Sequence, residues 1–306
     1  MMPSTGHAGD PASAIEIEPE SVVLAASPVA RSSSSVWMRD EHRRAVGALA
    51  ARFRAAVPFP HVVLESFLDP ARADEVARVF PRADSSWIRF THVNERKFGN
   101  PAVATFPAPL RELVAELSSP QFVTWLAQVT RIEGLRADPD LRGGGLHQTQ
   151  RGGFLNIHTD FSSHPQRSTW RRAINLVLFL NHDWREDYGG ALELWPADMS
   201  QCAARIPPRL NTCVIFQVGR ETRHGHPDPL ACPVDRARNS LALYYFTEDT
   251  APTPRHATTY YPRPGDGARG VLIRAENLAL RLFDGLRRRG WVTDEAVGRV
   301  LARLQR

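Results

Sequence analysis

A histidine and an aspartate two positions apart, His158 and Asp160, close a short run with the composition of a β-strand. Successive side chains of a strand alternate between its two faces, so both would project to the same side with their ligand atoms close together. Two histidines and one carboxylate form the facial arrangement that holds non-haem Fe(II) and leaves coordination positions open. The pair therefore predicts two of the three ligands of such a site.

Taken alone, the His-x-Asp spacing is a weak signal, because the chain contains 11 histidines and a second pair occurs at His226 and Asp228. A polar loop or a hydrogen-bonded surface histidine explains either pair more simply. The rest of the sequence must therefore supply the third ligand and the elements that position it.

Two candidates for the third ligand, His224 and His226, stand close together in the downstream sequence. His224 follows the apolar run 212–218 after a short turn, whereas His226 precedes a proline and lies deeper in the loop. We therefore predict His224. The alternative site, in which His226 and Asp228 join His256, is disfavoured because no clear strand separates these residues.

A carboxylate anchor is predicted at the start of the last long strand. The planar guanidinium of arginine matches a carboxylate bidentately, and the strand period of two places Arg238 and Ser240 on one face. Arg236 shares this parity and is the reserve candidate. Asn175 and Gln148 are further candidates for polar groups in the pocket, although backbone hydrogen bonds would also satisfy either amide.

The composition is that of a soluble globular protein. The chain has 306 residues, of which 42% are hydrophobic and 23% are charged, enough for one large or two modest domains. Its net charge is +5, but Lys97 is the only lysine and arginine supplies every other basic residue. This preference for arginine over lysine reflects coding composition as much as the charge of a binding partner, so we do not expect nucleic acid binding.

Cysteine usage and hydropathy predict a cytoplasmic protein with no membrane partner. Three cysteines without a Cys-x-x-Cys spacing, Cys202, Cys213 and Cys232, fit a reducing compartment. No apolar run reaches the roughly 18 residues needed to span a bilayer. The sequence does not specify an oligomeric state.

Helical periodicity precedes a run of strand patterns, which favours an α+β fold. Residues 1–35 are predicted to be a disordered tail, 36–142 a helical part that packs on a barrel, 143–250 the β-rich core and 251–306 a basic helical extension. Residues 85–100 mix aromatic and charged side chains and are predicted to be a loop, either facing substrate or at the surface. The strands expected in the core are 146–150, 154–158, 173–181, 191–195, 212–218 and 239–246.

The order of these parts resembles the prolyl 4-hydroxylase-like branch of the Fe(II)/2-oxoglutarate dioxygenases. The parts are, in chain order, Gly144-Gly145-Leu146-His147, His158-Thr159-Asp160, Leu178-Phe179-Leu180-Asn181 with Trp184, Gly189-Gly190-Ala191-Leu192, His224-Gly225-His226-Pro227 and Arg238-Asn239-Ser240. The likeness covers about residues 58–250. It implies a double-stranded β-helix, or jelly roll, flanked by helices.

The resemblance implies that His158, Asp160 and His224 bind Fe(II), and that Arg238, assisted by Ser240, binds the far carboxylate of 2-oxoglutarate. Such an enzyme uses O2 to hydroxylate an unactivated C–H bond and releases succinate and CO2, with ascorbate a candidate reductant. Asp160 favours hydroxylation, since related halogenases lack that carboxylate. The substrate would be a prolyl residue in a peptide, an amino acid or a metabolite.

A protein of another class remains an alternative, namely a non-catalytic β-barrel that binds an acidic small molecule. Arg238 discriminates between the two, because catalysis with 2-oxoglutarate needs a carboxylate anchor and a structural metal does not.

Overall fold

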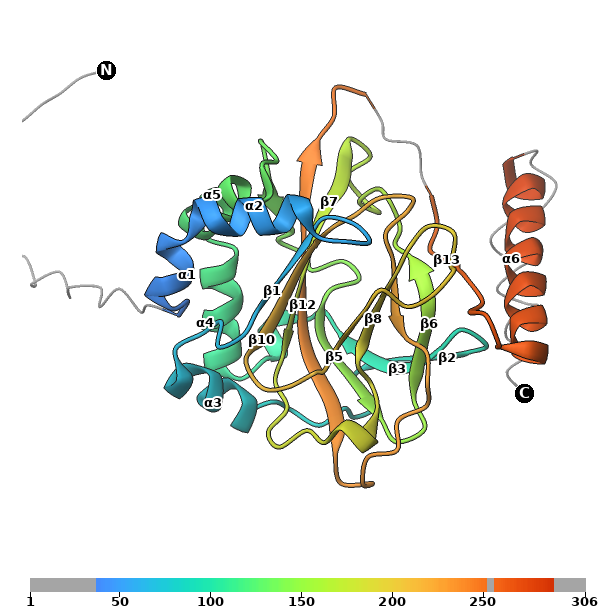
Figure 1. The fold of residues 1–306 in the computed structure, drawn as a ribbon, viewed down its shortest axis with the longest axis horizontal. Coiled ribbons are helices and arrows are strands. Elements are labelled where there is room, and N and C mark those ends of the chain that lie inside the picture. The colour runs from blue at the N-terminus through green and yellow to red at the C-terminus, as the bar shows by residue number, and fades with distance from the viewer. Residues whose placement is uncertain (1–36, 252–255, 289–306) are drawn as a thin grey trace, which may run out of the picture. The chain divides into compact units, whose positions relative to one another are not determined.

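The fold is an α+β double-stranded β-helix, as predicted. The computed structural model describes residues 37–251 and 256–288, and in this part of the chain 13 strands join one curled antiparallel sheet (Figure 1). The first layer runs β1 (His61–Leu64), β10 (Thr212–Gln217), β7 (Trp170–Phe179), β12 (Ala237–Glu248) and β5 (Gly145–Gln150). The second runs β6 (Phe154–Thr159), β11 (Arg223–His226), β8 (Leu192–Trp195) and β9 (Ala204–Ile206). All six strands predicted for the core are present.

A β-hairpin connects the two layers. It consists of β2 (Ile88–His92) and β3 (Glu95–Asn100), and β3 pairs with β5 through one part of its length and with β6 through the other. The loop predicted over residues 85–100 is therefore a hairpin instead. Its charged and aromatic residues do not show the apolar alternation of a strand that packs on a core, because one face lines a polar cavity. Two short strands, β4 (Arg136–Ala137) and β13 (Thr259–Tyr260), pair with β12 and β6 respectively.

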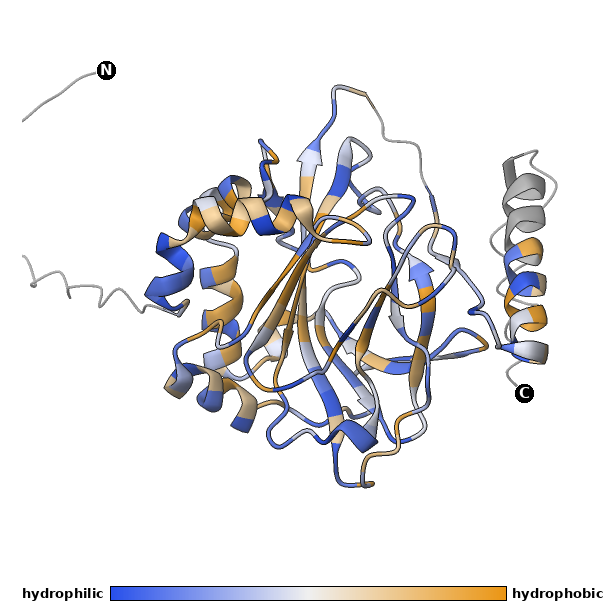
Figure 2. Cartoon of the chain, in the orientation of Figure 1, coloured by the Kyte–Doolittle hydropathy of each residue, from blue (hydrophilic) through white to orange (hydrophobic). Residues whose placement is uncertain are grey.

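Four helices pack on the outer face of the first layer, namely α2 (Val46–Ala55), α3 (Pro70–Arg78), α4 (Ala108–Leu117) and α5 (Pro120–Thr130). The short helix α1 (Asp40–Arg44) precedes them and buries no residue. The buried residues of the four helices form one cluster with alternate residues of β7, β10 and β12, and Figure 2 shows the hydrophobic residues on both sides of this contact. On β7, Leu176 and Leu178 face the helices while Asn175 and Val177 face the cavity, as the alternation predicts.

Two helix starts follow directly from side-chain chemistry. Asp69 accepts from the backbone N–H of Ala71 at 3.0 Å, and Pro70 stands at the first helical position of α3. Ser119 caps α5 in the same way, accepting from the N–H of Phe122 at 3.2 Å, with Pro120 after it. These capping residues fix the positions at which the two helices begin.

The last described element is α6 (Gly267–Arg288), which the sequence predicted. Leu272 and Leu278 on this helix are exposed, whereas Ile273 is buried. Polar contacts tie the helix to β13, since the Asn277 amide bonds both the backbone N–H and the carbonyl of Tyr260. The predicted N-terminal tail and residues 289–306 of the predicted helical extension lie outside the described residues. No helix of the described ranges is long and apolar enough to cross a membrane.

Asn211, ahead of β10, is expected to be a stability determinant. It has a left-handed φ of 62°, and its side-chain amide bonds both the N–H and the carbonyl of buried Leu68, at 2.7 and 2.8 Å. Asn211→Ala should lower the free energy of unfolding by about 3 kcal/mol, because two hydrogen bonds are lost and alanine is strained at positive φ. Chemical denaturation measures this loss. Asn211→Gly loses the same two hydrogen bonds but is not strained at positive φ, so its free energy of unfolding should fall by less. Equal losses in the two variants would contradict this account.

Candidate metal centre

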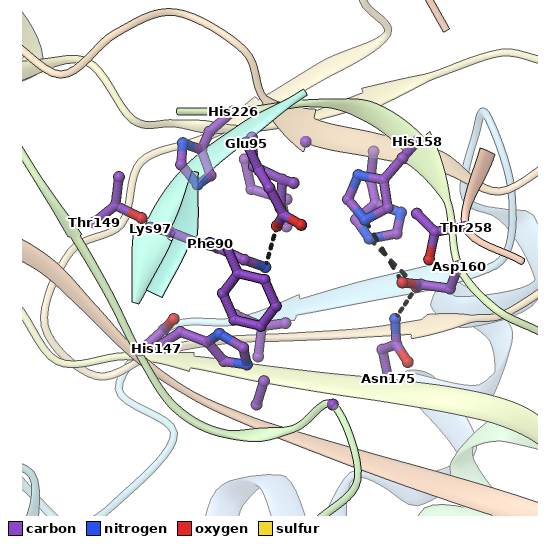
Figure 3. Close-up of a pocket in the computed structure, with 18 of the residues that line it drawn as sticks. Phe90, Glu95, Lys97, His147, Thr149, His158, Asp160, Asn175, His226 and Thr258 are labelled. Carbon is purple, nitrogen blue, oxygen red and sulfur yellow. Dashed lines mark hydrogen bonds and ion pairs between the residues drawn. The ribbon is translucent and has the colours of Figure 1, made fainter. Parts of the chain in front are cut away.

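Strand pairing brings three ligand-type side chains together. In the register of β6 and β11, His224 lies directly opposite His158, and Asp160 follows β6 by one residue. The ligand atoms of the three residues all lie within 4.8 Å of one another. The distance from His158 Nε2 to Asp160 Oδ1 is 3.5 Å, and that from His224 Nε2 to Asp160 Oδ2 is 3.4 Å. The three predicted residues therefore lie in one cluster, of which Figure 3 labels His158 and Asp160.

The orientation of one imidazole and the neutral charge of the other suit metal binding. His158 Nδ1 lies 2.9 Å from the carbonyl of Asn156, which can only accept, so Nδ1 donates to it and Nε2 faces the other ligand atoms. Burial lowers the pKa of His224 to about 3, despite the opposing charge of Asp160. His224 is therefore neutral at physiological pH.

Two neighbours hold the Asp160 carboxylate ionised and in place. Asn175 Nδ2 donates to Asp160 Oδ2 at 2.7 Å, and Arg172 Nη2 lies 3.3 Å from the same oxygen. Arg172 Nε also donates to Asn175 Oδ1 at 2.8 Å, which completes a closed network. Burial opposes ionisation, but the positive charge of Arg172 outweighs it, so the pKa of Asp160 lies well below its usual range. The donor set is thus two imidazole nitrogens and one carboxylate, which fits Fe(II).

Arg238 lines the same cavity, whose volume is about 270 Å³. Its side chain donates from Nε to the carbonyl of Gly190 at 2.7 Å and lies 4.7 Å from the ring centre of Phe179. Arg238 is 5% exposed, and within the described residues no carboxylate pairs with it. Burial lowers its pKa to about 9, so it remains cationic at neutral pH. An arginine buried without a counter-charge is costly unless an anion joins it.

Of the three remaining predicted residues, two line the cavity and one does not. Asn175 and Ser240 line the cavity. Gln148 does not, because on β5 it alternates with the cavity-lining His147 and Thr149; its amide bonds Ala83 N and Asn239 Oδ1 instead.

Neither reserve arrangement forms. The reserve Arg236 is half-buried and donates to the carbonyl of His182, outside the cavity. His226 lines the cavity, but its proposed partners are engaged elsewhere: Asp228 pairs with Arg263, and His256 contacts Arg220.

Several cavity residues were not predicted. Arg172 was missed because its contact with Asp160 depends on a strand pairing that the sequence does not reveal. The hairpin residues Phe90, Glu95 and Lys97 also line the cavity, on the side away from Asp160 and Asn175 in Figure 3. The signal available for them was the mixture of aromatic and charged residues at alternate positions.

We do not interpret a second group of ligand-type residues, Asp138, Asp140 and His164, as a metal site. Arg167 lies among them, with its guanidinium 2.7 Å from Asp140 Oδ2 and 3.0 Å from His164 Nε2. An arginine already provides the positive charge there, so this group is explained as an ion-pair network.

Comparison with known families identifies the β-rich core. Residues 144–246 match the model of the 2OG-Fe(II) oxygenase superfamily, and this segment contains the His–Asp–His cluster and Arg238. The chain carries a 2OG-Fe(II) oxygenase domain. Its class is therefore that of a dioxygenase that uses Fe(II), 2-oxoglutarate and O2. No curated protein matches the sequence of this oxygenase.

Solved structures with a similar fold include prolyl hydroxylases. A prolyl-4-hydroxylase from Pseudomonas putida is 19% identical, with a TM-score of 0.47 over 65% of this chain and 99% of that one. A prolyl hydroxylase from Trichoplax adhaerens, in complex with a hypoxia inducible factor peptide fragment, is 16% identical, with a TM-score of 0.46 over 67% and 90%. HygX from Streptomyces hygroscopicus, with nickel, 2-oxoglutarate and hygromycin B bound, is 12% identical, with a TM-score of 0.39 over 62% and 83%.

Asn175 is expected to support metal binding by the oxygenase. Asn175→Ala removes the amide that holds Asp160 Oδ2, so the dissociation constant of a divalent ion should rise about tenfold, as is typical when a group that orients a ligand is lost. Titration with Co(II), followed by its absorption spectrum, measures this change. The control is Gln150→Ala, an exposed amide on β5 outside the cavity. Unchanged affinity in Asn175→Ala would contradict the role given to this network.

Proposed function

We propose that this oxygenase is a hydroxylase that converts 2-oxoglutarate, O2 and a substrate C–H bond into succinate, CO2 and a C–OH group. The observation that supports this reaction most strongly is that one cavity combines the His158–Asp160–His224 cluster with Arg238, a buried arginine for which the described part of the chain provides no counter-charge. The first provides three ligands on one side of a metal ion. The second provides the binding site that a dicarboxylate requires.

In this proposal His158, Asp160 and His224 hold Fe(II). Arg238 binds the far carboxylate of 2-oxoglutarate through its guanidinium, and the Ser240 hydroxyl, which lines the same wall, assists. Bound Fe(II), together with 2-oxoglutarate and O2, supplies the oxidising power for the C–H bond.

The surrounding residues of the chain orient these groups and exclude water. Asn175 and Arg172 fix the Asp160 carboxylate. Phe179, Leu192 and Phe216 belong to an apolar cluster between the two layers, and the last two also line the cavity. A dry wall of this kind strengthens electrostatic contacts with the bound dicarboxylate.

Among the substrates considered, a prolyl residue, an amino acid and a metabolite all remain compatible with a cavity of this kind. The non-catalytic barrel is the less favoured alternative, because a structural metal has no use for Arg238. A cytoplasmic location and the absence of nucleic acid partners stay predictions from the sequence.

Asp160→Ala is expected to abolish succinate formation from Fe(II), O2 and 2-oxoglutarate. The change removes one of the three proposed metal ligands and no large apolar side chain, so the fold should persist. Succinate is measured by chromatography, and circular dichroism checks the fold. Asp228→Ala, the aspartate of the other His-x-Asp pair, is the matched control and should retain activity. Full activity in Asp160→Ala would exclude this set of ligands.

Arg238→Ala is expected to weaken 2-oxoglutarate binding by about 100-fold, which corresponds to loss of a buried charged hydrogen-bonded pair worth about 3 kcal/mol. Fe(II) binding should change little, because Arg238 is not in the ligand group. Anaerobic titration calorimetry measures both constants. Arg236→Ala, which alters the neighbouring arginine outside the cavity, should change neither. Equal loss of iron and 2-oxoglutarate affinity in Arg238→Ala would indicate a structural role.

A further inference from the structure

Lys97 is the single lysine of a chain that otherwise uses arginine for its basic residues, and it lies in the cavity of the proposed hydroxylase. Its side chain is 16% exposed, and its ammonium nitrogen lies 3.1 Å from Glu95 Oε2 and 5.2 Å from the ring centre of Phe90. A lysine ammonium has three donors. In the described ranges, Glu95 provides the one carboxylate that pairs with it, so donors remain for a ligand.

Glu95 faces the same cavity from two positions earlier on β3. Its other oxygen, Oε1, accepts from His92 Nε2 at 2.9 Å and from the Tyr260 hydroxyl at 3.4 Å. Burial favours the neutral carboxyl, but the hydrogen bond from His92 and the charge of Lys97 lower the pKa of Glu95 to about 2. The cavity wall therefore presents a permanent anion beside a cation.

The pair stands close to the metal centre. Tyr260, which bonds Glu95, is paired in register with His158, and the centres of their rings are 5.8 Å apart. Figure 3 shows Glu95 between His226 and His158, with the Lys97 nitrogen below it. A small molecule that contacts this pair would therefore lie next to the metal ligands.

Fold stability does not explain this position of the pair. Removing two charges from water costs about as much as their attraction returns, so a buried ion pair is weak evidence for a stabilising role. Of the three cations that line the cavity, Arg172 pairs with Asp160 and Arg238 is the proposed partner of 2-oxoglutarate. Lys97 is therefore a cation for which neither the metal ligands nor the cosubstrate has a use. A carboxylate on the substrate would provide its partner, and Glu95 would then be free to accept an ammonium group.

We propose that the substrate is a free α-amino acid, whose carboxylate binds Lys97 and whose ammonium binds Glu95. This inference rests on the proposed hydroxylase function. It distinguishes between the substrate classes, because a residue inside a peptide has neither of the two charges. The neutral total charge of the pair matches a zwitterion better than it matches a simple anion or cation.

The test measures equilibrium binding of each of the twenty standard L-amino acids to the intact protein. Titration calorimetry is performed anaerobically with Fe(II), with and without 2-oxoglutarate, so binding is read independently of turnover. The N-acetyl derivative of each binding amino acid lacks the ammonium group, and its methyl ester lacks the carboxylate. We expect at least one amino acid to bind, and either modification to weaken binding tenfold or more.

Two variants assign the charges to residues. Lys97→Gln should bind the free amino acid and its methyl ester equally, and Glu95→Gln should bind the free amino acid and its N-acetyl derivative equally. The matched control is Arg96→Gln, because Arg96 is exposed between the two residues and does not line the cavity; it should behave as wild type. The modified ligands test the proposal on wild-type protein even if a variant fails to fold.

Each outcome decides one point. If no amino acid binds to protein that does form succinate from 2-oxoglutarate, the substrate inference is wrong and the hydroxylase function stands. If the variants lower thermal stability yet keep the preference for unmodified amino acids, the pair is a structural tie between the hairpin and β13, and the inference is overturned. If neither 2-oxoglutarate binding nor succinate formation is detected, the hydroxylase function itself fails.

Discussion

The pairing of β6 with β11 is the constraint on which the metal centre depends. It sets His224 directly opposite His158 and then shifts, so that His226 lies opposite Leu155. Gly225 permits this close approach, since a Cβ atom there would lie 2.7 Å from the carbonyl oxygen of Asn156. A slip of one residue would turn both histidines of β11 away from the cavity, because strand side chains alternate between faces. One backbone register therefore determines whether a metal can be held at all.

Around this register, the cavity contains an unusual concentration of buried charge. Asp160 is neutralised by Arg172 and positioned by Asn175, which prepares a carboxylate for a cation. Among the residues that the structure describes, no carboxylate pairs with Arg238, so the burial of its charge is costly. Binding of a metal and a dicarboxylate would relieve this imbalance. The buried charges thus lower the stability of the fold and favour ligand binding, a common property of functional sites.

The parts of the site that sequence predicted are those governed by local periodicity. His158, Asp160 and Arg238 follow from alternation along single strands, and His224 from its distance after an apolar run. Gln148 failed to reach the cavity because the strand pattern did not establish which face of β5 points inward. Arg172 could not be predicted, because its contact with Asp160 depends on how the loop after Asp160 folds back onto β7, where the N–H of Arg172 donates to the carbonyl of Ser162. The helical part over residues 36–142 was predicted from local periodicity, and the caps Asp69 and Ser119 that begin α3 and α5 likewise act within a single turn.

The backbone and the side chains of the β2–β3 hairpin have separate roles. Its backbone completes the hydrogen bonding between the two layers, whereas the cavity is reached only by side chains at alternate positions, including Glu95 and Lys97. Backbone hydrogen bonds do not depend on side-chain identity, so these positions can accept new residues while the proposed iron ligands, which lie on or next to other strands, keep their geometry. The hairpin is therefore a natural place for the substrate range of such an enzyme to diverge in evolution, or to be redesigned in the laboratory.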